Sequence, residues 1–271
     1  MIGCILLTYN RFSGDRQFLL SESVESFLRQ THQDAVLLIC NDTPGQKIQV
    51  EDEIGRRIRI FNFERRFPFL TDKIQAMIDK NPDCDMFCRW DDDDISLPNR
   101  LTLSHDHLLA GNCLEWRPNN YVWSTSPGSY RHISKPGNTH VMSLWRRDVL
   151  KYFPEGKYPQ RISGWEDQTF NQYLSQYNVP RSVEKSISYQ DVTYVYRWGA
   201  SDRHLSSKRQ GSDSSLQAHY DSIGTQPIRA GNFTIHPYWQ RDYESEVRSL
   251  DHHVSDSSRS RGNSPIASSM E

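Results

Sequence analysis

The stretch MFCRWDDDD at residues 86–94 decides the fold class of this 271-residue chain. Its first part, Met86–Trp90, is a short apolar run with the length and composition of a buried strand. The run passes directly into four aspartates, Asp91–Asp94, and Pro98 then marks the start of a helix that ends near Gly111. A strand that leads into an acidic turn and then a helix is typical of an α/β sheet, whose ligands bind beyond the carboxyl ends of the strands.

The same alternation of strand and helix precedes this stretch. The apolar runs Ile2–Leu7 and Val36–Cys40 predict buried strands, and Ile58–Phe63 alternates as a strand does. Apolar side chains at helical spacing predict one helix that runs to about Gln30 and another that stops at Asn81. We therefore expect an α/β protein with a mostly parallel central sheet and helices on both of its faces.

Polar residues follow three of these strands. Thr8–Arg11, Asn41–Thr43 and Asp91–Asp94 each come directly after an apolar run. Because the carboxyl ends of parallel strands meet at one edge of a sheet, we expect the three segments to lie together there. This convergence indicates a binding site more strongly than any one of the segments does.

The second half of the chain has less regular patterns. Pro127–Gly137 has the composition of a loop, His140–Leu144 predicts a strand, and Tyr189–Trp198 predicts one or two more. The segment Ser163–Asp167 opens another predicted helix.

Composition limits the kind of protein. A net charge of −2 argues against nucleic-acid binding through bulk positive charge, although five arginines lie close together between Arg56 and Arg66. The first residues lack a secretory signal, and no apolar run reaches the roughly 18 residues that span a bilayer. Cys4 and Cys40 lie in apolar runs, and no second Cys or His pair with zinc-finger spacing follows the C-x3-C pair Cys84 and Cys88. These features favour a soluble, cytoplasmic protein.

The four aspartates carry the chemistry of the predicted site. Gathered at a strand end, they would repel one another unless a cation offsets their charge. Carboxylate oxygens suit Mg²⁺ or Mn²⁺, which in turn bind phosphate oxygens. Two other interpretations are a solvated acidic loop and a cap for the following helix, in which Asp94 or Ser96 would take part.

A second acidic pair, Glu166-Asp167, lies at the start of a predicted helix. The helix dipole stabilises a carboxylate there, and such a group is well placed to take a proton from an attacking hydroxyl. Trp165 offers a flat apolar face for a sugar or a base. Simple helix capping explains the pair equally well. Asp42, in a turn, and His204, beside Arg203, carry no specific signal by themselves.

Taken in chain order, these segments resemble the family-2 inverting glycosyltransferases with the GT-A fold. The likeness rests on Thr8–Arg11 after the first strand, Asn41-Asp42 after the second, and a first helix that contains Glu22-Ser23-Val24. Asp91–Asp94 look like the D-x-D region of that family, and Gly164–Asp167 are similar to its later "ED" motif. The likeness covers roughly residues 1 to 210.

The resemblance implies a role for each matching position. Thr8 and Asp42 would contact the nucleoside of a nucleotide-sugar donor, and Asp91 and Asp93 would touch its ribose and the metal on its diphosphate. Asp167, supported by Glu166, would deprotonate the acceptor hydroxyl in a single inverting displacement. The full set of candidates comprises catalytic Asp167 and Glu166; donor-binding Thr8, Tyr9, Arg11, Asp42, Asp91, Asp92, Trp165 and Arg203; and metal-binding Asp93, Asp91 and His204.

The resemblance also implies how the chain is organised. We expect a GT-A-like catalytic domain over residues 1–215, a C-terminal extension that packs on it over 216–250, and a Ser-rich disordered tail over 251–271. Arg197-Trp198 only partly echo the Gln-x-x-Arg-Trp motif of processive members, so we expect a non-processive enzyme, and a UDP-sugar is the expected donor.

The sequence leaves the acceptor open. It is a hydroxyl of a glycan, a lipid-linked sugar or a small molecule, or of a macromolecule such as a modified DNA base or a protein side chain. A non-catalytic module that binds a nucleotide-sugar is a further alternative. A nucleotidyltransferase is disfavoured, because the first strand does not end in a Gly-rich phosphate loop.

Overall fold

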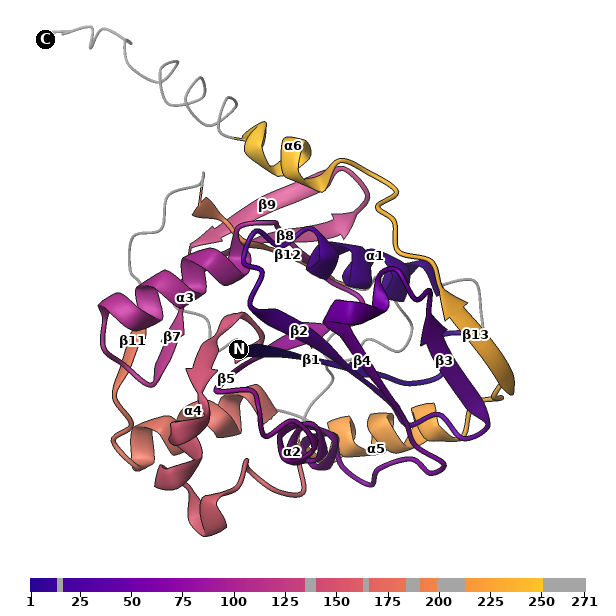
Figure 1. Cartoon of the computed structure of the whole chain (residues 1–271), viewed down its shortest axis with the longest axis horizontal. Coiled ribbons are helices and arrows are strands. Elements are labelled where there is room, and N and C mark those ends of the chain that lie inside the picture. The colour runs from indigo at the N-terminus through magenta and orange to yellow at the C-terminus, as the bar shows by residue number, and fades with distance from the viewer. Residues whose placement is uncertain (14–16, 135–139, 163–165, 184–190, 199–212, 251–271) are drawn as a thin grey trace, which may run out of the picture.

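The computed structural model describes residues 1–13, 17–134, 140–162, 166–183, 191–198 and 213–250 (Figure 1). Its centre is a seven-stranded sheet in the order β11-β7-β10-β5-β1-β2-β4. The bounds of these strands are β1 Ile2–Thr8, β2 Ala35–Asn41, β4 Ile58–Asn62, β5 Met86–Asp91, β7 Glu115–Arg117, β10 Leu144–Arg146 and β11 Arg181–Val183. Strands β5, β1, β2 and β4 are parallel, and β10 is antiparallel to both of its neighbours. The expected α/β class and mostly parallel sheet are confirmed.

Helices cover both faces of this sheet (Figure 1). Their bounds are α1 Gln17–Leu28, α2 Leu70–Lys80, α3 Arg100–Ala110 and α4 Glu166–Gln176. Alternate residues of a strand point to opposite faces, so Leu6 of β1 packs in the core beneath α1 and α3, and Ile5 packs in the core against α2 and α4. Gly3 keeps this packing close, because a Cβ there would lie 2.9 Å from the Phe87 ring.

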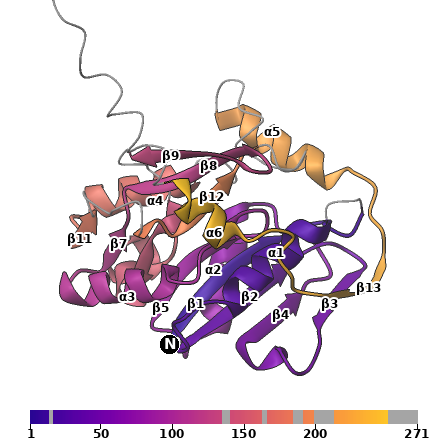
Figure 2. The same cartoon turned by 90° about the horizontal axis from the view of Figure 1, so that it is seen from above.

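Two smaller sheets flank the central one. One has the order β6-β12-β8-β9, with β6 Ile95–Ser96, β8 Asn120–Ser126, β9 Ser129–Ser134 and β12 Tyr194–Arg197. The other pairs β3 (Gln46–Val50) with β13 (Gly231–Ile235), side by side in Figure 2.

The expected loop at Pro127–Gly137 was wrong in part. Pro127 and Gly128 form the turn of a β-hairpin, and β9 pairs with β8 directly after it. Gly128 has a φ of 78°, which glycine adopts without strain. The strand expected at His140–Leu144 was also displaced, because His140–Met142 form a 3-10 turn and β10 begins only at Leu144.

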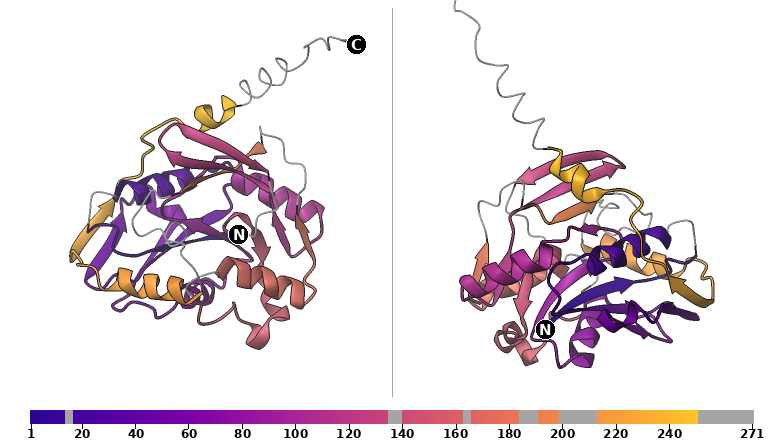
Figure 3. Two further views of the ribbon diagram at one scale, coloured as in Figure 1. Left: turned by 180° about the vertical axis from the view of Figure 1, so that it is seen from behind. Right: turned by 45° about the horizontal axis from the view of Figure 1, so that its top comes forward.

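The C-terminal segment packs on the rest of the protein. It contains α5 (Asp213–Gly224), β13 and α6 (Tyr243–Arg248). Helix α6 lies over the four-stranded sheet β6-β12-β8-β9 (Figure 3), and Tyr243 and Val247 of this helix pack with Val122 of β8. Residues 251–271 lie outside the described ranges, and the domain boundaries stay predictions. None of the described helices has the length and apolar character needed to cross a membrane.

Candidate functional site

The polar segments that follow β1, β2 and β5 lie at one edge of the central sheet. Thr8 at the end of β1 is in register with Asn41 of β2, and Leu7 is in register with Asp91 of β5. The backbone N–H of Asn10 donates a 2.7 Å hydrogen bond to Thr43 Oγ1. The strand order therefore brings these segments together, as the sequence predicted.

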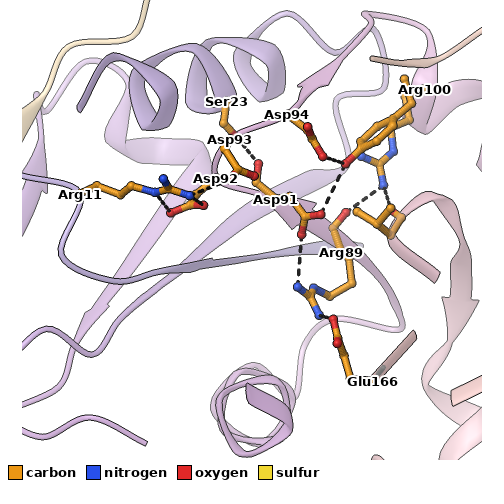
Figure 4. Close-up of polar contacts among 11 residues, drawn as sticks. Arg11, Ser23, Arg89, Asp91, Asp92, Asp93, Asp94, Arg100 and Glu166 are labelled. Carbon is orange, nitrogen blue, oxygen red and sulfur yellow. Dashed lines mark hydrogen bonds and ion pairs between the residues drawn. The ribbon is translucent and has the colours of Figure 1, made fainter. Parts of the chain in front are cut away.

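Arg11 forms ion pairs with two of the four aspartates (Figure 4). Its Nε and Nη2 donate to the two carboxylate oxygens of Asp92 at 2.7 and 2.5 Å, and Nη2 also donates to Asp93 at 2.9 Å. All three side chains are buried. A bidentate pair of this kind is the strongest arrangement between an arginine and a carboxylate. Sequence analysis placed Arg11 among the donor-binding residues, and the structure makes it the charge partner of the acidic turn.

Arg89 joins the two acidic motifs into one site. Its Nη2 lies 3.2 Å from Asp91 Oδ1 and its Nη1 lies 3.2 Å from Glu166 Oε1 (Figure 4). The Arg89 side chain is buried, whereas Asp91 is partly exposed. Burial raises the pKa of Asp91, and Arg89 opposes that change. The sequence analysis missed Arg89, although a charged residue inside the apolar strand Met86–Trp90 is an unusual feature that signals a buried partner.

Asp94 connects the acidic turn to β12. It accepts hydrogen bonds from the Tyr194 hydroxyl at 2.5 Å and from the backbone N–H of Arg197 at 2.6 Å. Burial raises the pKa of Asp94 well above its usual range, and the neighbouring carboxylates act in the same direction. Helix α3 begins after Asn99 with no side-chain cap, so the capping alternative for Asp94 was wrong. Burial of Asp92, Asp93 and Asp94 also excludes a solvated loop.

The ion pairs of Arg11 and Arg89 affect how a metal ion could bind to the aspartates. The mutual repulsion of the aspartates is offset in part by Arg11 and Arg89. Among the described residues, no group of three His, Cys, Asp or Glu side chains is arranged to hold a metal ion. A site that offers only one or two carboxylates fits an ion such as Mg²⁺, which completes its coordination shell with substrate phosphates and water. Asp91, partly exposed at the strand end, is such a donor.

Asp42 forms a buried ion pair. Its Oδ1 lies 2.6 Å from Lys73 Nζ, and its Oδ2 accepts a 2.9 Å hydrogen bond from the backbone N–H of Phe67. Burial acts to lower the pKa of Lys73, but the charge and hydrogen bond of Asp42, together with Tyr220 and Cys40, outweigh burial and the pKa is raised. Lys73 was not predicted. Its position three residues after Leu70, on the apolar side of α2, could have indicated a buried partner.

Tyr9 lies beside this ion pair. Its hydroxyl donates to the backbone carbonyl of Gly224 at 3.3 Å, and the Arg66 guanidinium lies 4.4 Å from its ring centre. Arg66 also lies 3.9 Å from the ring centre of Tyr220, so α5 closes over this part of the site.

The second acidic pair occupies the first turn of α4, as predicted. Glu166 pairs with Arg89, and Asp167 contributes to the electrostatic environment of Arg117. Arg117 Nη2 donates to Asn171 Oδ1 of the same helix at 2.7 Å, which ties α4 to β7. Three other candidates, Trp165, Arg203 and His204, lie outside the described residues.

No protein-family model and no curated protein matches this sequence. Solved structures do match the fold, among them several of S. aureus TarS, a GT-A-type family-2 glycosyltransferase. One TarS structure has a TM-score of 0.54 and 12% identity, over 82% of this chain and 42% of TarS. TarS residues 1–349 match with a TM-score of 0.54 and 14% identity in complex with UDP-GlcNAc, over 79% of this chain and 60% of that one. The complex of TarS residues 1–349 with UDP matches with a TM-score of 0.53 and 12% identity, over 82% of this chain and 70% of that one.

The match confirms the GT-A fold that the resemblance implied. This chain spans less than half the length of the longest of these TarS chains.

Proposed function

We propose that this protein is an inverting, non-processive glycosyltransferase that moves one sugar from a nucleotide-sugar, a UDP-sugar first of all, to an acceptor hydroxyl. The observation that carries the proposal is the contact of Arg89 with both Asp91 and Glu166, which unites the strand-end carboxylates and the helix-start carboxylates in one site. The fold shared with TarS, which has been solved with UDP-GlcNAc and with UDP, supports a nucleotide-sugar as donor. Two separate acidic motifs in one site also favour an enzyme over a module that only binds.

The donor is assigned to the edge formed by β1, β2 and β5. Thr8, Tyr9 and Asp42 would form the nucleoside end of the site, and Lys73 forms a buried ion pair with Asp42 there. Asp91 would face the ribose and the diphosphate.

A divalent ion, Mn²⁺ or Mg²⁺, would supply positive charge for the diphosphate that leaves. Asp91 and Asp93 would hold it, with His204 as a further ligand. Arg11 holds the carboxylates of Asp92 and Asp93 in place, and its positive charge reduces the electrostatic repulsion between them.

Asp167 is assigned as the base. It lies in the first turn of α4, where the helix dipole favours the ionised carboxylate. Arg89 holds the adjacent Glu166 and so orients the start of this helix toward the strand-end aspartates. The acceptor hydroxyl would give its proton to Asp167 as its oxygen attacks the anomeric carbon and the bond to the nucleoside diphosphate breaks, and inversion follows because that carbon undergoes a single displacement.

We also propose that the enzyme acts in the cytoplasm. All five cysteines lie within the described ranges and are free and buried, as suits a reducing compartment.

The first test measures release of nucleoside diphosphate from UDP-, GDP- and dTDP-sugars with Mn²⁺, Mg²⁺ or EDTA. Turnover of one donor that EDTA abolishes is the expected result. If no donor is bound or turned over with any metal, the protein is not this enzyme.

Two variants separate the roles. Asp167→Asn should abolish transfer while leaving the donor Kd unchanged, because the base acts only on the acceptor. Asp93→Asn should weaken metal and donor binding together. Equal loss of donor binding in both variants would contradict the division of roles.

A further inference from the structure

Four aromatic side chains form a continuous cluster on the four-stranded sheet β6-β12-β8-β9. Trp123 of β8 stacks on Trp198 with ring centres 4.7 Å apart, and it meets Tyr196 of β12 at 5.4 Å. Tyr121 lies 6.2 Å from Tyr196. All four are partly exposed. We call Tyr121, Trp123, Tyr196 and Trp198 the aromatic face.

The pairing of the strands puts these side chains on one side. Tyr196 is in register with Trp123 on the neighbouring strand, and the backbone N–H of Trp198 continues the pairing by donating to Ser124 O at 2.9 Å. Residues two apart on a strand share a face. The intervening residues, Val122 and Val195, point the other way into the core that α6 covers.

The aromatic face lies next to the candidate active site. Tyr194 lies two residues before Tyr196 on the same side of β12, and its hydroxyl donates to Asp94 at 2.5 Å and lies 3.5 Å from Asp91 Oδ2. A strand rises about 3.3 Å per residue, so Trp198 lies roughly 13 Å further along from Tyr194. The aromatic rings therefore lead away from the carboxylates over the length of an extended ligand.

We propose that the aromatic face binds the acceptor and that the acceptor is a carbohydrate chain; this inference rests on the proposed function. The flat C–H face of a sugar ring is apolar and stacks on an aromatic ring, while the hydroxyls at its rim stay hydrated. A polar molecule that also has apolar faces suits a row of half-exposed tryptophan and tyrosine rings, which offer large contact area with a defined geometry.

Charge argues against a nucleic acid on the same surface. Tyr194, the next ring along β12 from the aromatic face, contacts the carboxylates of Asp91 and Asp94, and the whole chain has a net charge of −2, so bulk positive charge does not favour a phosphate backbone here. Proteins that stack bases on aromatic rings combine those rings with a positively charged groove that follows the backbone.

The test is direct binding, without any donor. The full chain is titrated by calorimetry with neutral tetrasaccharides of β-1,4-glucose, β-1,4-N-acetylglucosamine and α-1,4-glucose. The wild type should bind at least one of them. Trp123→Ala should bind that sugar about three- to ten-fold more weakly, as expected for one lost aromatic contact, and Trp123→Phe should keep most of the affinity.

Two controls guard against misfolding. Tyr238→Ala removes an aromatic ring that is 44% exposed elsewhere on the surface, and it should bind like the wild type. Thermal unfolding of each variant checks that the fold is retained, and Tyr196→Ala replaces Trp123→Ala if that protein does not fold.

The outcomes separate this proposal from the proposed function. Sugar binding that depends on Trp123, in a protein that turns over no donor, would support the aromatic face and reject the glycosyltransferase. Donor turnover with no binding of any tetrasaccharide, or equal binding by Trp123→Ala, would overturn the proposal. Tighter binding of single-stranded DNA with steep salt dependence would assign the face to nucleic acid and overturn it as well.

Discussion

Ionisation of Glu115 is predicted to destabilise this protein at neutral pH. Glu115 is the first residue of β7 and its side chain is 0% exposed. Arg117 Nε lies 3.9 Å from one carboxylate oxygen, and neither oxygen accepts a hydrogen bond from the described residues. Burial raises the pKa of Glu115 from its ordinary 4.5 to about 7, although Arg117 and Arg181 act to lower it.

The size and sign of the effect follow from these pKa values. A difference of about 2.5 corresponds to ~3 kcal/mol, at about 1.4 kcal/mol for each pKa unit. The folded protein holds the proton more tightly than the unfolded chain does. The stabilising contribution is therefore fully present below pH 4.5 and is lost as the pH rises from there to about 7. Above that pH the fold bears the whole cost of a buried, ionised Glu115.

Glu115→Gln removes the ionisation and nearly preserves the shape. In urea unfolding at about pH 8, we expect the variant to be more stable than the wild type by ~2–3 kcal/mol, with the difference close to zero at about pH 4.5. Glu53→Gln, at an exposed position, is the matched control and should show no such pH dependence. A Glu115→Gln variant less stable than the wild type at about pH 8, or a stability difference independent of pH, would contradict the prediction that ionised Glu115 destabilises the fold.

Three further substitutions test the buried charges. Arg89→Met leaves Asp91 and Glu166 without their shared cation, so the free energy of unfolding should fall by ~3–5 kcal/mol and donor turnover should be lost. Arg89→Lys should partly restore both. Wild-type stability of Arg89→Met would contradict the role of Arg89 as the shared cation. Lys73→Met strands the buried charge of Asp42, and we expect a similar loss in urea unfolding together with a weaker Kd for UDP by calorimetry. Glu22→Gln removes the charge that pairs with Arg197, and Glu22 also accepts a hydrogen bond from the Tyr243 hydroxyl of α6. The variant should therefore be cleaved faster next to α6 in limited proteolysis. An unchanged cleavage rate would show that Glu22 does not hold α6 in place.

The parts of the fold that sequence analysis predicted depend on local patterns. β1 and β2 are buried on both faces, so each appears as an uninterrupted apolar run that can be recognised without knowing its neighbours, and only Arg89 interrupts the apolar part of β5. The helices show their buried side through apolar residues three and four apart.

Pairings between distant segments were not predicted. β3 and β13 pair in parallel although nearly two hundred residues separate them, and neither segment alone has a strong strand pattern. The hairpin of β8 and β9 was missed because its Pro127-Gly128 turn has the same composition as an irregular loop.

At the candidate site, the residue types and their position at the strand ends were predictable from the chain alone. A short apolar strand followed by Asp91–Asp94 places carboxylates at the edge of a parallel sheet in any α/β fold. The cations that pair with these carboxylates depend on the three-dimensional fold. Arg11 and Asp92 lie 81 residues apart, and Arg89 and Glu166 lie 77 apart. Charge attraction acts through space and leaves no periodic signal along the chain, so these partners became identifiable only once the sheet had brought them within hydrogen-bond distance.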